Sequence, residues 1–214
     1  MIGLPVGWTS CTISEAMEST IGGVWGEAPG EAEIDVDVIR VTEMKAFGRL
    51  EPGTAARRSV TTSQMSSRSL QPGDLLLEKS GGGPNTPVGR VGIVVRLDGP
   101  TVCSNFMQLM RPNRDVLIPR FLMWHLVNAH ITGVTASLQT ATTNIRNLKM
   151  KDYWEVRLHT PGSGTGADRH NDRRGFLQAR RRRGRPSNCP PTPQAHAKGR
   201  PRRGVHGPPR PTRP

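Results

Sequence analysis

The chain has 214 residues, of which 34% are hydrophobic and 22% charged, and its formal net charge is +13 at pH 7. Residues 1–158 carry 16 Lys and Arg against 15 Asp and Glu, whereas residues 159–214 carry 14 against 2. The body is therefore nearly neutral and long enough for one domain, and its net charge gives no argument for a polyanionic partner.

Composition disfavours membrane and secreted proteins. No apolar run approaches the roughly 20 residues of a membrane span, and the opening MIGLPVGWTS lacks the basic and apolar regions of a secretory signal. Cys11, Cys103 and Cys189 are isolated, without CxxC or metal-ligand spacing, and are expected to be free thiols. We therefore expect a cytoplasmic protein.

The first half of the body alternates between turn signals and short apolar runs. Residues 12–17 are expected to form a short helix or the end of a strand. Residues 36–41 alternate and are β-branched, which predicts a strand. Residues 48–69 are polar, and we interpret them as a loop with a strand over 58–62.

The most informative stretch is residues 70–95, LQPGDLLLEKSGGGPNTPVGRVGIVV. Pro72-Gly73-Asp74 is typical of a turn, and residues 75–77 after it predict a short apolar strand. Residues 91–95 predict the return strand. The loop between these strands contains three consecutive glycines, with Lys79 before them and Arg90 after them. Such a small-residue loop between two cations favours the binding of a polyanion.

The second half of the body predicts further strands and one long helix. Residues 101–104 and 107–111 are predicted strands, and Pro119 suits the first turn of a core helix over 119–129. Residues 144–148, after a possible Thr142-Thr143 N-cap, predict a short helix, and 153–158 predict the last strand. The predicted fold class is α+β, a single domain of short strands with two or three helices.

The tail, residues 159–214, has a different composition. It holds 13 Arg, 10 Pro and 8 Gly with few large apolar residues, so disorder is expected. Its four arginines at 180–183 are candidates for non-specific contact with nucleic acid or membrane. The favoured interpretation is that the tail is translated out of frame, because a one-base shift across residues 162–172 permits Ala-Ala-Glu-Gln-Glu-Arg-Ile-Val-Thr-Thr-Ile.

Six short motifs follow one another in the body. They are Leu-Pro-x-Gly-Trp at 4–8, Gly-Gly at 22–23, Arg-x-x-Glu-Met at 40–44, Leu-x-x-Gly-Asp-Leu-Leu at 70–76, Pro-x-Phe-Leu at 119–122 and Asn-Ile-x-x-Leu at 144–148. In this order and spacing they resemble the target recognition domain of a type I restriction–modification specificity subunit. The resemblance covers residues 4–158.

The resemblance implies a DNA-reading subunit of a bacterial defence system, not an enzyme. Such a subunit directs partner methyltransferase and restriction subunits to a motif in double-stranded DNA, and no cofactor, metal or catalytic residue is implied for this chain. The cations would hold phosphates or read guanine, Gln64 and Asn85 would read adenine, and Ser80 with the glycine amides would also hold phosphates. The candidate DNA-binding residues are Arg57, Arg58, Gln64, Arg68, Lys79, Ser80, Asn85 and Arg90.

The chain departs from the family pattern after Leu158. There the family has Pro-Pro-Leu-x-Glu-Gln-x-Arg-Ile at the start of a long helix, whereas this chain has His159-Thr160-Pro161. The shifted frame restores Glu-Gln-Glu-Arg-Ile at this place. We therefore expect one recognition domain over 1–158, a frameshift after it, and loss of the helical spacer, which makes an inactive truncated remnant an alternative.

Two further hypotheses are a non-specific nucleic-acid-binding protein that acts through the tail and a small-molecule enzyme. The glycine loop lacks the GxxxxGK[ST] of a P-loop, and Cys103-Ser104 has no positioned base. His125 and His130 are expected to be structural or exposed, because no carboxylate stands at metal spacing. Trp8, Trp25, Trp124 and Trp154 are expected to anchor the core instead of stacking on bases.

Overall fold

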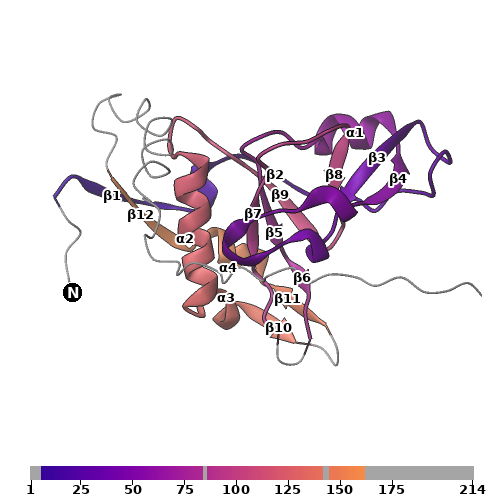
Figure 1. The fold of residues 1–214 in the computed structure, drawn as a ribbon. Coiled ribbons are helices and arrows are strands. Elements are labelled where there is room, and N and C mark those ends of the chain that lie inside the picture. Colours follow the sequence, from indigo (N-terminus) through magenta and orange to yellow (C-terminus); the bar gives the residue numbers. More distant parts are fainter. Residues whose placement is uncertain (1–5, 84–85, 142–144, 162–214) are drawn as a thin grey trace, which may run out of the picture. The chain divides into compact units, whose positions relative to one another are not determined.

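The structure, a computed structural model, describes residues 6–83, 86–141 and 145–161 (Figure 1). Within these residues four sheets carry the fold, and the largest of them has four strands in the order β2-β9-β5-β7. Those strands are β2 (Met17–Gly22), β9 (Met107–Pro112), β5 (Leu75–Glu78) and β7 (Val91–Ile93). Their pairings are all antiparallel, so the predicted hairpin of β5 and β7 is confirmed.

A three-stranded sheet has the order β4-β3-β8. Its strands are β4 (Ala56–Val60), β3 (Ile34–Ile39) and β8 (Thr101–Cys103), and β3 pairs with β8 in parallel. Four valines on these strands form a small core of their own: Val36, Val38, Val60 and Val102. The strands predicted near 36–41, 58–62, 101–104 and 107–111 are thus present, with ends shifted by a few residues.

Two smaller sheets complete the strands. One has the order β10-β11-β6, formed by β10 (Gln139–Ala141), β11 (Arg146–Leu148) and β6 (Ser80–Gly81). In the other, β1 (Trp8–Thr12) pairs with β12 (Arg157–Pro161) and joins the two ends of the described chain. Strand β12 runs three residues past the predicted end of the body at 158, and the remainder of the predicted tail lies outside the described residues.

The α-helices are α1 (Thr62–Arg68), α2 (Pro119–Ile131), α3 (Val134–Ser137) and α4 (Met150–Trp154). Single 3₁₀ turns are η1 (Ser14–Ala16), η2 (Val41–Glu43), η3 (Ala46–Gly48) and η4 (Pro52–Thr54). This mixture confirms the α+β class. None of the described helices is long and apolar enough to span a membrane.

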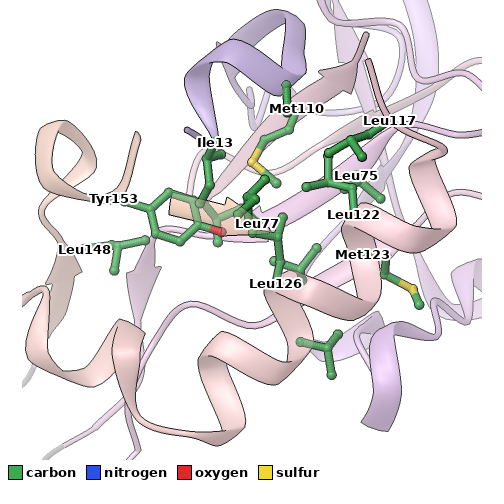
Figure 2. Packing of buried hydrophobic residues seen from close by; sticks show 14 of the residues in the cluster. Ile13, Leu75, Leu77, Met110, Leu117, Leu122, Met123, Leu126, Leu148 and Tyr153 are labelled. Carbon is green, nitrogen blue, oxygen red and sulfur yellow. The ribbon is translucent and has the colours of Figure 1, made fainter. Parts of the chain in front are cut away.

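Helix α2 forms where it was predicted, and it covers the main core. Its buried residues Leu122, Met123, Leu126 and Val127 recur every three or four positions, as on one helix face. They pack with Leu75 and Leu77 of β5 in the cluster of Figure 2. Strand side chains alternate, so the intervening Leu76 lies in a second cluster on the other side of the sheet. The apolar run 75–77 is therefore buried on both faces.

Three local predictions were wrong. Residues 146–148 form β11, not a helix, because this segment pairs with both β10 and β6. Tyr153 ends up in α4, where its side chain is buried, and the last strand starts only at Arg157. Helix α1 was missed in the polar stretch after β4. Its signal was present, because Thr61 and Gln64 form a capping box at its start.

Candidate nucleic-acid interface

The site is built on the glycine-broken segment of residues 22–26, which follows β2. The Gly23 amide donates to the Met107 carbonyl at 3.0 Å, and the Val24 amide donates to the Cys103 carbonyl at 2.8 Å. A Cβ on Gly23 would collide with the carbonyl oxygens of Cys103 and Ser104. Only glycine lets the segment lie this close to the β8–β9 turn. We call residues 22–26 the docked segment.

Three predicted cations converge on the docked segment. Arg58 Nη2 donates to the Gly26 carbonyl at 3.1 Å, and Arg68 Nε donates to the Gly22 carbonyl at 3.0 Å. The ammonium of Lys79 lies over Gly22, 3.0 Å from where a Cβ would stand. These three side chains come from β4, α1 and the end of β5, and they are separated by up to 21 positions in sequence.

A cavity of about 490 Å³ opens beside the docked segment. It is lined by Trp25, Glu78 and the three short stretches 40–42, 80–82 and 104–106. Trp25 and Phe106 are both partly exposed, at 38% and 45%. The predicted glycine loop thus supplies one wall, and residues that sequence reasoning did not select supply the others.

Arg40 directly follows β3, lines the cavity and pairs with a buried carboxylate. Its Nη2 lies 2.8 Å from Oε1 of Glu43, which is fully buried and also accepts from the hydroxyls of Thr42 and Thr54. Burial opposes ionisation of Glu43, but the hydrogen bonds from Arg40 and the two threonines outweigh it and lower its pKa to about 2. The carboxylate is therefore ionised at neutral pH and fixes the guanidinium.

Other predicted residues are engaged within the fold. The guanidinium of Arg90 pairs with the buried carboxylate of Glu78 at 2.8 Å, and Arg57 pairs with Asp37 at 3.2 Å. The Gln64 side chain accepts from the Thr61 amide at 3.0 Å as part of the capping box. These contacts give Arg90 and Gln64 structural roles.

Ser80 lies in β6 and lines the cavity, but its hydroxyl also donates to Oδ1 of Asn147 at 2.6 Å. Asn85 lies outside the described residues, so its predicted role is untested by the geometry. The candidates that remain are therefore Arg58, Arg68 and Lys79 at the docked segment and Ser80 at the cavity. The residues that sequence reasoning missed are Trp25, Arg40, Asn105 and Phe106, and the one signal in the sequence was the Gly22-Gly23 pair two positions before Trp25.

The prediction that all four tryptophans anchor the core was wrong for three of them. Trp8, Trp25 and Trp124 are 37%, 38% and 47% exposed. Trp154 is partly buried against the main core. The Trp25 ring instead lies under Arg58, whose guanidinium carbon is 5.0 Å from the ring centroid, a cation–π distance.

His125 and His130 are half-buried on α2. Burial lowers the pKa of both imidazoles and so favours their neutral form. Nδ1 of His130 shares a hydrogen bond of 2.9 Å with the Thr135 hydroxyl. Within the described residues, no group of three or more His, Cys, Asp or Glu is placed to hold a metal ion.

Sequence comparison finds no protein family whose model matches this chain, and no similar curated protein. Comparison of folds does find similar structures. An S subunit of a type I restriction–modification system from M. genitalium matches with a TM-score of 0.50 and 13% identity. The match covers 84% of this chain and 40% of that subunit. The chain has the fold of a type I S subunit.

A second match supports the S-subunit fold. A chain from a structural study of assembly and conformational transition in the type I R-M system matches with a TM-score of 0.52 and 18% identity. It covers 85% of this chain and 43% of that chain. The chain thus spans less than half the length of the two chains that it matches.

Proposed function

We propose that this chain is a DNA target recognition domain of a type I specificity subunit and binds one short motif in double-stranded DNA. The observation that supports the proposal is the convergence of Arg58, Arg68 and Lys79 on the docked segment, in a chain with the S-subunit fold. The three cations come from different elements, and the fold brings them to one surface. A single polyanion can therefore contact all three.

The geometry suggests different roles in DNA binding for the cations and for the cavity wall. Lys79 and Arg68 contribute charge beside a backbone strip of glycines, where little side-chain bulk keeps a phosphate away. Arg58 is different, because its guanidinium covers Trp25 and, among the described residues, its buried Nε has no hydrogen-bond partner. We expect Lys79 and Arg68 to contribute affinity and the cavity wall to contribute selectivity.

The domain performs no chemistry of its own in this proposal. Its role is to hold methyltransferase and restriction subunits at the motif, and those subunits would carry the catalytic groups and cofactors. We place this assembly in the bacterial cytoplasm. The S-subunit fold supports the partner assignment, and the proposal extends it to this chain.

Selection from a random duplex library tests the proposal. The full chain is incubated with the library, bound duplexes are enriched over several rounds, and the pools are sequenced. Enrichment of one motif supports a recognition domain, whereas retention of all sequences alike argues against it. The matched variant carries alanine at all four arginines of 180–183; if it loses all binding, the tail and not the domain holds the DNA.

The out-of-frame origin of the tail remains part of the proposal, with its own test. Sequencing the locus through the codons for residues 158–172 and beyond, in all frames, shows whether a shifted frame continues into Glu-Gln-x-Arg-Ile and a long heptad helix. If no frame does so, the tail is a genuine product and its contribution to binding becomes the main question.

A further inference from the structure

The cavity beside the docked segment has aromatic residues from two different parts of the chain on its rim. Trp25 stands in the docked segment, and Phe106 stands in the β8–β9 turn. The two are brought together by the hydrogen bonds from Gly23 to Met107 and from Val24 to Cys103. Large exposed aromatic side chains are costly to keep in water, and here they flank a hollow of about 490 Å³, within the size range of ligand sites.

One face of the Trp25 ring is already occupied. The Arg58 guanidinium lies over it, and Arg58 does not line the cavity. The ring is thus held in place from one side, while Trp25 as a residue remains 38% exposed and contributes to the cavity wall. A ring fixed in this way is a pre-organised stacking surface, because little side-chain freedom is lost when a flat ligand covers it.

The polar groups of the cavity suit a neutral ligand with hydrogen-bonding edges. Glu78 is neutralised by Arg90 at 2.8 Å, and Arg40 is neutralised by Glu43 at 2.8 Å, so neither presents a free charge. Asn105 lines the cavity and is exposed, and within the described part of the chain its side-chain amide has no hydrogen-bond partner. An amide both donates and accepts, as the edge of a nucleobase requires.

We propose that this cavity binds one unstacked nucleobase, which stacks on Trp25 and Phe106 and is held at its edge by Asn105. The inference rests on the proposed function, since it names a subsite within the same DNA-binding surface. Lys79 is next to the site, because its backbone amide donates to the Phe106 carbonyl at 3.0 Å. Its ammonium lies over Gly22 in the docked segment, where we expect it to meet the phosphate of the same nucleotide. Stacking on aromatic rings is how proteins hold bases taken out of a helix.

The first arm of the test does not depend on a known DNA motif. The full chain is titrated with the four deoxynucleoside 5′-monophosphates, and deoxyribose 5-phosphate is the control that has the phosphate but no base. We expect the nucleotides, and not the control, to shift the indole N–H resonance of Trp25, assigned with Trp25→Phe. Trp25→Ala should weaken nucleotide binding about tenfold or more, and Trp124→Ala, which removes a tryptophan that is 47% exposed on α2, should leave it unchanged.

The second arm uses the duplex motif obtained by selection. Each nucleotide of the motif is replaced in turn by an abasic spacer. If one base enters the cavity, removal of its pairing partner tightens binding because the unpairing cost disappears, and Trp25→Ala abolishes that gain. Asn105→Ala should reduce discrimination among bases at that one position by roughly tenfold.

The outcomes separate the two proposals. Suppose that a motif is selected, but nucleotides do not shift the Trp25 resonance and no abasic position tightens binding. The cavity inference is then wrong, and the proposal of a recognition domain is unaffected. Failure to select any motif overturns the recognition domain, while the nucleotide titration still decides the cavity. If Trp25→Ala leaves both arms unchanged but weakens binding of a methyltransferase subunit, the cavity takes a protein side chain and the inference is wrong.

Discussion

Asp74 and Arg111 form a two-point ion pair that fastens the turn before β5 to the neighbouring strand β9. Arg111 Nε donates to Oδ1 of Asp74 at 2.9 Å and Nη2 donates to Oδ2 at 2.8 Å. The carboxylate is almost wholly buried and also accepts from the Gln71 amide at 2.7 Å. This explains why an aspartate ends the turn: it closes the turn locally and joins it to β9.

Asp74→Asn is therefore expected to destabilise the domain by about 2 kcal/mol. The substitution leaves the Arg111 guanidinium, only 25% exposed, without its counter-charge, and partial exposure reduces the penalty from the full cost of an orphaned buried charge. Urea unfolding of the full chain measures the change. The control is Asp98→Asn, whose pair with Arg96 is 80% and 85% exposed, so its effect should stay well below about 1 kcal/mol. If both substitutions lower the free energy of unfolding equally, the Asp74 pair contributes no more to stability than an exposed surface pair.

Glu43 should make the free energy of unfolding depend on pH in the acidic range. Its pKa is about 2 in the folded chain, below the ordinary value of 4.5, so its stabilising effect is complete above the ordinary value and is lost as pH falls from about 4.5 toward 2. Because Arg40 is partly exposed, we expect a loss on the order of 2 kcal/mol. Thermal unfolding of the wild type and of Glu43→Gln across this range measures it. Parallel curves for the two proteins would contradict the assignment.

How far the sequence predicts this fold depends on how local each signal is. The hairpin around residues 75–93 and helix α2 were predictable because turn residues and apolar spacing lie within each segment. Strand β11 was not, because residues 146–148 form a strand through pairing with both β10 and β6, and β6 lies more than 60 positions earlier in the chain. Long-range pairing outweighs local propensity.

The same limit applies to the site. Charge and side-chain type identified Arg58, Arg68 and Lys79, but not that all three would meet at residues 22–26. Nothing in the local sequence shows that Arg90 would be neutralised by Glu78, or that the Trp25 ring would stay exposed. The docked segment takes its place through the close approach of Gly23 to the β8–β9 turn, a contact between segments about 80 positions apart. The Arg90–Glu78 pair depends instead on the pairing of β5 with β7.

Gly23→Ala tests that close approach directly. The added Cβ would collide with two backbone carbonyls, which cannot move aside as a flexible side chain can, so we expect a loss of about 1–3 kcal/mol in the free energy of unfolding. Gly99→Ala is the matched control, since a Cβ there meets nothing within 4 Å, and its effect should be near zero or slightly stabilising. A Gly23→Ala protein as stable as the control would mean that the docked segment does not lie against β8.

Lys79→Gln is expected to weaken binding to the selected duplex and to non-specific duplexes by similar factors. A lysine that contacts a phosphate contributes affinity without reading sequence, so its loss also lowers the slope of log Kd against log salt by about 1. Fluorescence anisotropy at several salt concentrations measures both quantities. Arg96→Gln removes the same charge from a side chain 85% exposed and should leave the slope unchanged if that position lies outside the footprint. If Lys79→Gln instead weakens binding to the selected duplex only, the ammonium contacts a base. Lys79 would then contribute selectivity, the role proposed for the cavity wall.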